Sequence, residues 1–463
     1  MTINLKELPV EVGLVHEGER IRGPDTFLEL GGPKVEYKAE LVQLADGKSI
    51  KDEGFELVGK DIPDFSEGDK TPFGILVEVY GKKIEKDIES VIERRIHDFI
   101  NYIQGMMHLN QRYDIWCRIS KEARDKGLKF EHIAKAMMAL FKTEFPFIEK
   151  IQVTLMTDEA AVKKHHAMAM KVYEARDARI RGMKDSDVDE FYGCTLCQSF
   201  APTHLCIISP ERVSLCGAIS WIDARAAARV DPEGPNFVVK KGELLNEKAG
   251  EYSGVNDAVG EYSNGTIGRF NMYSMFGPIH TSCGCFEAIG FYIPEVDGIG
   301  VVDRNFAGPA VNGIKFSSMA TQAGGGAQVE GFLGFGIQWM YSDKFFSGDG
   351  GLGRIVWMPS HLKERMKGAI PKDLLDKIPT EKDVESVGDL RSFLDGKKHP
   401  VVGRWAKEKK TEDLNANEGG LETAQPILVP EMGIPAAGGG VRIILKNARI
   451  YADKVIIRKN TLP

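Results

Sequence analysis

Six of the seven cysteines fall between positions 194 and 285, and their spacing limits what this chain can fold around. The first group has the pattern C-x2-C-x8-C-x9-C and consists of Cys194, Cys197, Cys206 and Cys216. Four thiolates gathered in this way suit a 4Fe-4S cluster or a structural zinc ion. Zinc ribbons usually repeat the x2 spacing in their second pair. This chain does not, so the pattern favours the cluster.

The second group is the tripeptide Cys283-Gly284-Cys285, which places two thiols two positions apart. If the backbone nitrogens of Gly284 and Cys285 lose their protons, one metal ion can take two sulfurs and two nitrogens in a plane. Square-planar nitrogen and sulfur donors favour Ni(II) or Cu(II) over zinc. Glycine is expected in the middle because a Cβ would crowd such a flat loop. A disulfide here would close a small strained ring, whereas a turn with two ordinary cysteines stays an alternative.

Together, the two cysteine groups and the 66 residues between them carry a resemblance to a known family. The chain is similar to acetyl-CoA synthase. It resembles more closely the beta subunit of the archaeal acetyl-CoA decarbonylase/synthase complex. The likeness covers most of the chain, and no position of the six-cysteine motif departs from it.

The resemblance implies a compound metal site, in which a 4Fe-4S cluster is bridged to two nickel ions, one proximal and one distal. The first four cysteines would hold the cluster, and Cys197 would also bridge to the proximal nickel. Cys283 and Cys285 would bridge both nickels, and the amide nitrogens of Gly284 and Cys285 would complete the plane of the distal one. Phe200, three residues after the bridging cysteine, matches the family's apolar gate over the proximal nickel.

The same resemblance implies a reaction and its partners. A corrinoid-bound methyl group, carbon monoxide and coenzyme A would be condensed into acetyl-CoA, or acetyl-CoA would be cleaved in reverse. Carbon monoxide dehydrogenase subunits and a corrinoid iron–sulfur protein would be the protein partners. Two other classes stay open on the residues alone: an iron–sulfur electron-transfer subunit without nickel chemistry, and a zinc-stapled scaffold. The Cys-Gly-Cys tripeptide is the feature that an electron-transfer subunit would not require.

Coenzyme A is thought to approach the family's site through a region with tryptophan and arginine that precedes the cluster domain. In this chain the matching side chains are Trp116, Arg112 and Arg118. The alternatives are core packing for the tryptophan and a solvated face for the arginines.

The predicted fold class combines an α/β part with an α+β part. Residues 1–182 are expected to form an α/β layer domain with a β-rich segment at its start, over residues 1–70, where Asp46-Gly47 is a hairpin-type turn signal. From residue 72 onward, strand patterns alternate with helical ones, which is typical of α/β layers. The predicted strands are 74–80, 114–119 and 151–156, and the predicted helices are 84–103, 130–145 and a long helix capped by Thr157.

A polar, glycine-containing stretch at 181–190 marks a boundary, after which strands are short and glycines frequent. Residues 183–405 are therefore expected to form a mixed α+β metal-cluster domain. Residues 406–463 are expected to form a charged linker followed by a C-terminal strand pair. The glycine run at 323–328 is expected to allow close backbone approach near the metal site rather than to bind phosphate.

Charge and hydropathy exclude some classes of partner. The net charge of −7 argues against general binding to nucleic acid or to an anionic membrane. No apolar run approaches the length of a membrane span, and the N-terminus lacks a signal-peptide pattern. A cytoplasmic location is expected.

Overall fold

The computed structural model describes residues 3–277, 282–325 and 329–405. Residues Met1–Trp405 form one compact unit. The expected linker and C-terminal strand pair over 406–463 lie outside the described residues. No helix within the described ranges combines the length and the apolar character needed to cross a membrane.

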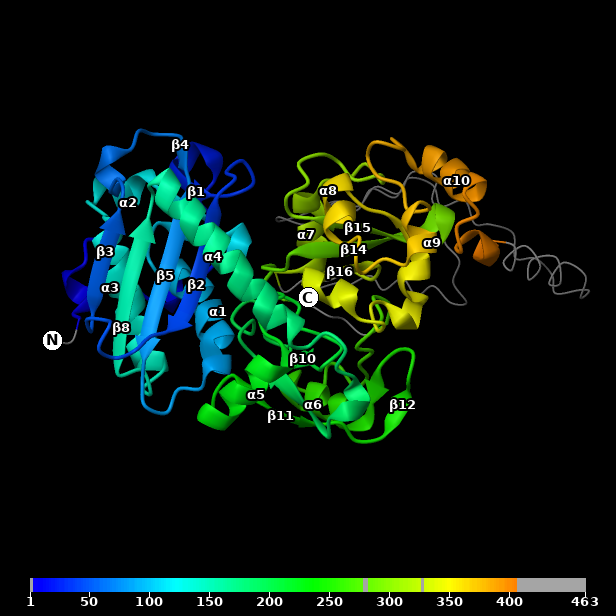
Figure 1. Cartoon of the computed structure of the whole chain (residues 1–463), viewed down its shortest axis with the longest axis horizontal. Helices are drawn as coiled ribbons and strands as arrows, with labels where there is room; N and C mark the ends of the chain where they lie inside the picture. The colour runs from blue at the N-terminus through cyan, green and yellow to red at the C-terminus, as the bar shows by residue number, and fades with distance from the viewer. Residues whose placement is uncertain (1–2, 278–281, 326–328, 406–463) are drawn as a thin grey trace, which may run out of the picture. The chain divides into compact units, whose positions relative to one another are not determined.

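Two mixed four-stranded sheets form the first part of the chain (Figure 1). β5 is central in one of them, since it pairs in parallel with β2 and antiparallel with β8. In strand order this sheet consists of β2 (Lys38–Leu44), β5 (Phe73–Tyr80), β8 (Lys150–Met156) and β3 (Gly54–Val58). The other consists of β4 (Asp69–Thr71), β1 (Thr26–Gly31), β7 (Trp116–Ser120) and β6 (Met106–Asn110).

These sheets confirm the strands predicted at 74–80 and 151–156, and β1, β2 and β3 lie within residues 1–70. The early strands do not form a sheet of their own, because β2 pairs with β5 and β3 pairs with β8. The turn at Asp46-Gly47 is not a hairpin turn. It leads from β2 to β3, which lie at opposite edges of one sheet.

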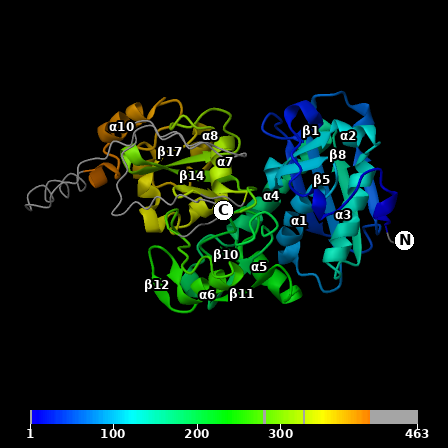
Figure 2. The ribbon, with the colours of Figure 1, turned by 180° about the vertical axis from the view of Figure 1, so that it is seen from behind.

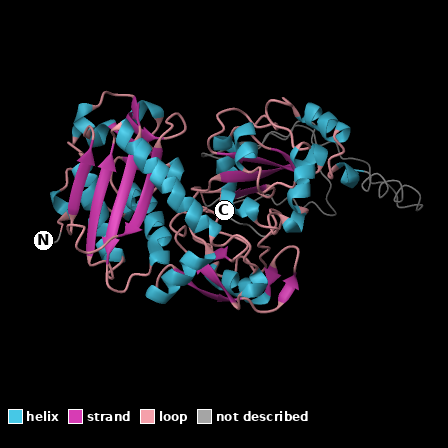
Figure 3. Ribbon diagram, in the orientation of Figure 1, coloured by secondary structure: helices cyan, strands magenta, loops and turns pink. Residues whose placement is uncertain are grey.

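Helices pack against these sheets, as Figure 3 shows. α4 (Glu159–Ala178) lies on β2 and β5, α3 (Phe130–Glu144) lies on β8 and β3, and α1 (Glu89–Asn101) contacts β2 of one sheet and β6 of the other. α2 (Lys121–Asp125) is short and is capped by the Ser120 hydroxyl. The cap of α4 is Asp158 rather than Thr157, because the Asp158 carboxylate accepts from the Ala161 backbone N–H.

Shorter strands and more irregular backbone follow, seen from behind in Figure 2. β10 (Cys206–Ile208), β9 (Glu190–Cys194) and β11 (Asn236–Lys240) form one sheet, and β12 (Leu244–Asn246) pairs with β13 (Glu251–Tyr252). The last sheet has the order β16 (Phe332–Phe335), β14 (Ala288–Ile293), β15 (Gly298–Asp303) and β17 (Ile355–Trp357). The helices here are α5 (Trp221–Val230), α6 (Ser253–Tyr262), α7 (Phe316–Ala323), α8 (Ser360–Arg365), α9 (Lys372–Leu375) and α10 (Val387–Gly396).

The fold is thus a mixed α/β arrangement of several sheets, as expected. The predicted boundary at 182–183 falls between α4 and β9 and stays a prediction. One apolar core cluster runs from Val10 to Ile378, so it includes residues from both sides of that boundary. A continuous core places side chains of the first part against the cysteines of the second.

Candidate metal centre

The first four cysteines line one cavity. Cys194 ends β9 and lies directly opposite Cys206, the first residue of the antiparallel strand β10. Cys197 comes from the turn that follows β9, and Cys216 from the loop after β10. The cavity is lined by Arg94, Cys194, Leu196, Cys197, His204, Cys206, Ser214, Leu215, Cys216 and Ile219. Four sulfurs from two strands and two loops therefore face one small space.

The Cys-Gly-Cys turn (residues 283–285) adjoins this cavity. The Sγ atoms of Cys283 and Cys285 are 3.1 Å apart, and neither thiol is in a disulfide. The Cys283 thiol shares a hydrogen bond with Cys197, and the Cys285 thiol shares one with Cys216. The structure therefore brings all six cysteines together, although the two groups are far apart in the sequence.

Gly284 has a backbone conformation that favours glycine. Its φ is +101°, in the region that side-chain-bearing residues rarely adopt. Apart from its two chain neighbours, the nearest described atom to a Cβ there would be Gly325 N at 3.8 Å, and crowding within the loop itself stays a prediction. Crowding occurs at Gly324, where a Cβ would lie 2.8 Å from Gly284 Cα. This part of the glycine run allows close approach of two backbones, as predicted.

We expect Gly324→Ala to displace the Cys-Gly-Cys turn and to lower nickel binding. Gly324 has an extended backbone with φ −157°, so the change adds only a steric conflict, with Gly284 Cα and with Phe286 Cε1 at 2.9 Å. Overpacking of this kind costs about 1–3 kcal/mol. Nickel per chain should fall by roughly half or more while iron is retained, because the conflict lies on the nickel side. The matched control is Gly268→Ala, where a Cβ meets nothing within 4 Å. Unchanged nickel content in Gly324→Ala would contradict the prediction.

Burial and mutual contact set the charge of the six thiols. Burial raises the pKa of Cys194 to about 12 and also raises that of Cys206. The hydrogen bonds that Cys283 shares with Cys197 and then with Cys285 hold the pKa of Cys283 well below its usual range. The bond with Cys285 does the same for the pKa of Cys216. The same contacts hold the pKa values of Cys197 and Cys285 well above their usual range, so negative charge is favoured at Cys216 and Cys283. Buried negative charge needs positive charge beside it.

Arg94 supplies one such charge. This arginine of α1 is 1% exposed and lines the four-cysteine cavity. Its Nη2 lies 3.6 Å from Cys283 Sγ, and its Nη1 donates to Asp98 Oδ1 at 2.9 Å. Although burial opposes it, the attraction of Arg94 and Arg95 holds the pKa of Asp98 well below its usual range. A buried pair on α1 thus holds a guanidinium against the second cysteine group.

The donor set fits an iron–sulfur cluster joined to nickel. Four soft sulfur donors around one cavity suit a cluster, and a turn with two thiols and two backbone nitrogens suits nickel. Among the described residues, no three His, Cys, Asp or Glu side chains are grouped to hold a single metal ion. Around a cluster, each thiolate binds a different iron, so the sulfurs stand further apart than around one ion.

Phe200 follows the cluster turn, and its backbone N–H donates to the Cys197 carbonyl at 3.1 Å. Its ring lies beside the N-terminal segment, since a Cβ on Gly18 would come within 3.2 Å of Phe200 Cε1. The neighbouring Ser199 hydroxyl donates to Glu17 Oε1 at 2.9 Å. The expected gate residue is therefore held between the cluster turn and residues 17–18, a contact that the sequence does not reveal.

The three side chains expected near coenzyme A do not form one group. The Arg118 guanidinium lies over the Trp116 ring at 4.8 Å, and both side chains are partly exposed. Arg112 is buried; its Nη1 donates to the Gly217 carbonyl at 3.0 Å and its Nη2 pairs with Asp177 at 3.1 Å. A contact of these residues with coenzyme A stays a prediction.

A buried polar network that sequence reasoning missed joins the first part of the chain to the cysteine loops. Gln111 Nε2 donates to the Cys216 carbonyl at 2.8 Å. The Tyr113 hydroxyl donates to Glu287, two residues after Cys285, and accepts from Arg365 Nη2 at 2.6 Å. These contacts fix the loops that carry Cys216 and Cys285 to the 3₁₀ turn Arg112–Asp114 and its neighbours.

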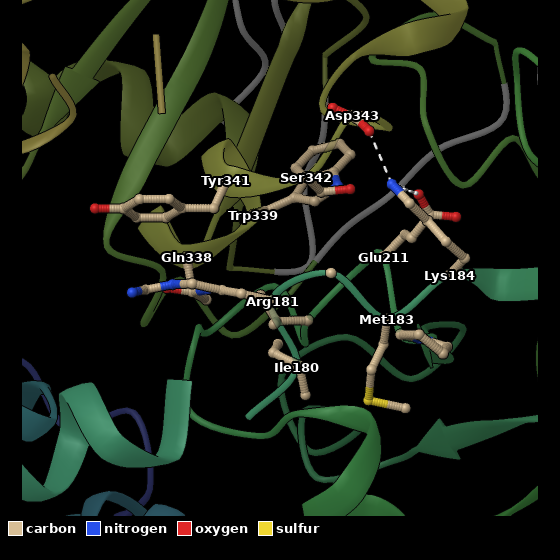
Figure 4. Close-up of a pocket in the computed structure, with 13 residues that line it drawn as sticks. Ile180, Arg181, Met183, Lys184, Glu211, Gln338, Trp339, Tyr341, Ser342 and Asp343 are labelled. Carbon is tan, nitrogen blue, oxygen red and sulfur yellow. Dashed lines mark hydrogen bonds and ion pairs between the residues drawn. The ribbon is translucent and has the colours of Figure 1, made fainter. Parts of the chain in front are cut away.

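A second cavity lies apart from the cysteines (Figure 4). Its cationic side chains have partners of their own. Lys184 Nζ pairs with Asp343 at 2.8 Å and with Glu211 at 3.4 Å. The Arg181 guanidinium lies over the Tyr341 ring at 4.2 Å. Because the charges are already balanced, this cavity has no clear preference for an anionic ligand.

Comparison with known proteins agrees with the cysteine motif. Residues 8–162 match the family described as CO dehydrogenase/acetyl-CoA synthase complex beta subunit, and residues 173–405 match the family described as the C-terminal part of the ACS/CODH beta subunit. The chain is 52% identical over 466 residues to acetyl-CoA decarbonylase/synthase complex subunit beta 2 of Methanosarcina thermophila, covering 98% of each chain. It is also 52% identical to the subunit beta of Methanothermobacter thermautotrophicus, over 98% of this chain and 99% of the relative.

Among solved structures, the C-terminal domain of an acetyl-coenzyme A synthase alpha subunit is 38% identical. The match covers 26% of this chain and 95% of that domain with a TM-score of 0.24, which carries no argument about the fold. The full-length relatives and the two family matches show the family of this chain without that structure. This chain belongs to the family of archaeal acetyl-CoA decarbonylase/synthase complex beta subunits.

Proposed function

We propose that this chain is a CO-methylating acetyl-CoA synthase, an acyltransferase. It joins a corrinoid-bound methyl group, carbon monoxide and the thiolate of coenzyme A into acetyl-CoA, and it also catalyses the reverse cleavage. The relatives are named as subunits of an acetyl-CoA decarbonylase/synthase complex. When bound, a nickel–nickel–4Fe-4S group would supply the bond-making chemistry.

One observation carries this proposal: the two cysteine groups meet, Cys197 against Cys283 and Cys216 against Cys285. An electron-transfer subunit would need only the four cysteines of the cavity. The adjoining Cys-Gly-Cys turn adds donors suited to a second, different metal. We assign Cys194, Cys197, Cys206 and Cys216 to the cluster, and Cys197, Cys283, Gly284 and Cys285 to nickel.

The chain's own residues would bind the group, orient it and exclude water. Thiolate donors make a metal centre electron-rich, and their loops are fixed by the network around Gln111 and Tyr113. The backbone N–H of Phe200 donates to the Cys197 carbonyl, and its apolar ring lies beside Gly18. Arg94 offsets part of the negative charge at Cys283. No side-chain general base is required by this arrangement.

The partners that we propose follow from the reaction. Carbon monoxide dehydrogenase subunits would supply or remove carbon monoxide, and a corrinoid iron–sulfur protein would carry the methyl group. Coenzyme A would approach through the region of Trp116, Arg112 and Arg118. We place the chain in the cytoplasm, without nucleic-acid or membrane partners.

The test is an isotope exchange with the whole chain, loaded with iron and nickel in the absence of oxygen. We expect the labelled carbonyl carbon of acetyl-CoA to exchange with carbon monoxide, which requires cleavage of both the carbon–carbon and the carbon–sulfur bond. A fully loaded chain that transfers electrons but exchanges no carbonyl label would contradict the proposal.

A further inference from the structure

Arg304 contacts the Cys-Gly-Cys turn and is not among the residues that line the four-cysteine cavity. It directly follows β15, and its backbone N–H donates to the Glu287 carbonyl at 3.2 Å. Its Nη2 donates to two carbonyls of the turn region, Gly284 O at 2.8 Å and Phe286 O at 3.1 Å. One nitrogen of one guanidinium therefore holds the carbonyls that flank Cys285.

This guanidinium has an unusual set of partners. Within the described ranges it donates to no carboxylate, and its central carbon lies over the Phe316 ring at 5.0 Å. Burial lowers the pKa of Arg304, although Cys285, Asp114 and Cys283 oppose this shift. A cation partly withdrawn from water without a directly bonded anion indicates that negative charge is expected at the turn itself.

The Gly284 carbonyl is the atom at which that charge would arise. The peptide bond that contains this carbonyl also contains the backbone nitrogen of Cys285. A peptide nitrogen that binds nickel without its proton shares its negative charge with the carbonyl oxygen, because the peptide group is conjugated. A guanidinium 2.8 Å from that oxygen stabilises this form more strongly than the neutral peptide.

The other proposed nitrogen donor lacks such a cation among the described residues. The Gly284 N–H donates to the Ser282 hydroxyl at 3.2 Å, a hydrogen bond that nickel would replace. Arg94 approaches the turn at Cys283 Sγ, a sulfur, rather than at a carbonyl. Arg94 and Arg304 thus contact different atoms of the same turn.

We propose that Arg304 is a positioning residue for nickel at the Cys-Gly-Cys turn. It fixes the peptide plane between Gly284 and Cys285 and balances the charge that this peptide gains when its nitrogen binds nickel. On binding, the protons of both thiols and of both peptide nitrogens leave to the solvent. This inference rests on the proposed nickel site and concerns the affinity of that site, not the acetyl chemistry.

The experiment titrates the chain, with its iron cluster in place, with Ni(II) alone under anaerobic conditions. Nickel affinity is measured by competition with a chelator, and the nitrogen and sulfur neighbours are counted by X-ray absorption. Arg304→Gln should weaken nickel binding about tenfold or more, the scale of a lost hydrogen bond between charged groups, with iron unchanged. Arg304→Lys, which keeps the charge, should recover part of the affinity. The matched control is Arg391→Gln, since Arg391 donates to the carbonyl of Glu295 at an exposed position.

The outcomes separate this inference from the proposed function. If the unmodified chain holds nickel with nitrogen and sulfur neighbours and Arg304→Gln holds it equally well, the role of Arg304 is wrong and the nickel site stands. If the unmodified chain holds no such nickel, the proposed site is wrong and the inference falls with it. If Arg304→Gln also loses iron, the nickel affinity of Arg304→Lys is the test instead. An affinity no higher than that of Arg304→Gln would then contradict the role of Arg304. If Arg304→Gln keeps its nickel affinity although X-ray absorption counts only one nitrogen neighbour, the proposed role of the contact with the two carbonyls is wrong.

Discussion

Replacing Cys283 with alanine is expected to abolish carbonyl exchange while leaving the iron cluster in place. Cys283 is the residue of the Cys-Gly-Cys turn whose thiol shares a hydrogen bond with Cys197 of the other group. Its Sγ lies 3.1 Å from Cys285 Sγ. Exchange should fall by more than about a hundredfold, since even the outer contacts of metal ligands are worth roughly 10–100-fold. Nickel per chain should fall with it. Iron should stay at about four per chain, because the four cysteines of the cavity are untouched.

The control for this variant is Cys117→Ala. Cys117 is a fully buried thiol in β7, outside both cysteine groups, and burial holds its pKa well above the usual range. Its replacement removes a similar volume without removing a proposed ligand. It should lower stability by about 1–2 kcal/mol and leave metal content unchanged. Undiminished exchange by Cys283→Ala would rule out the assignment of the turn to nickel.

Replacing Arg94 with glutamine is expected to lower the reduction potential of the cluster. The guanidinium is buried, lines the cluster cavity and lies 3.6 Å from Cys283 Sγ. Loss of a nearby positive charge makes it harder to add an electron. The expected shift is on the order of 50–150 mV, equivalent to roughly 1–3 kcal/mol for a unit charge in a protein interior. A redox titration followed by electron paramagnetic resonance measures it.

Arg95→Gln separates this effect from lost stability. Both arginines pair with Asp98, so either change removes a partner from a buried ion pair and should destabilise the fold by about 3–5 kcal/mol. Only Arg94 also reaches the cavity, whereas Arg95 reaches Glu144. Arg94→Lys should restore part of the potential. Equal potentials in the Arg94→Gln and Arg95→Gln chains would refute the electrostatic role of Arg94.

Local patterns in the sequence predicted the elements and the cysteine groups well. The strands at 74–80 and 151–156 and the helix starting at Phe130 follow from periodicity, which is a local property. The cavity cysteines come from one strand pair and its adjoining loops, so spacing alone could suggest them. The hairpin predicted at Asp46-Gly47 was wrong because the partners of β2 and β3 come from later in the chain, and no local signal specifies such pairing.

The charged surroundings of the site could not be predicted for the same reason. Arg94 is separated from Cys283 by 189 positions, and Arg94 and Arg95 are indistinguishable in the sequence. Only the orientation of α1 decides which of them faces the cysteines, since neighbours on a helix point about 100° apart. Arg304 likewise follows an ordinary strand. What identifies it is the pair of carbonyls that it holds.

The central claim is that one chain holds an iron–sulfur cluster and nickel at six adjoining cysteines. Metal analysis of the whole chain, purified without oxygen, tests it most directly. We expect about four iron and two nickel per chain, with nickel lost and iron retained in Cys283→Ala. Iron without nickel would indicate an electron-transfer subunit, zinc alone would indicate a scaffold, and either result would contradict the account.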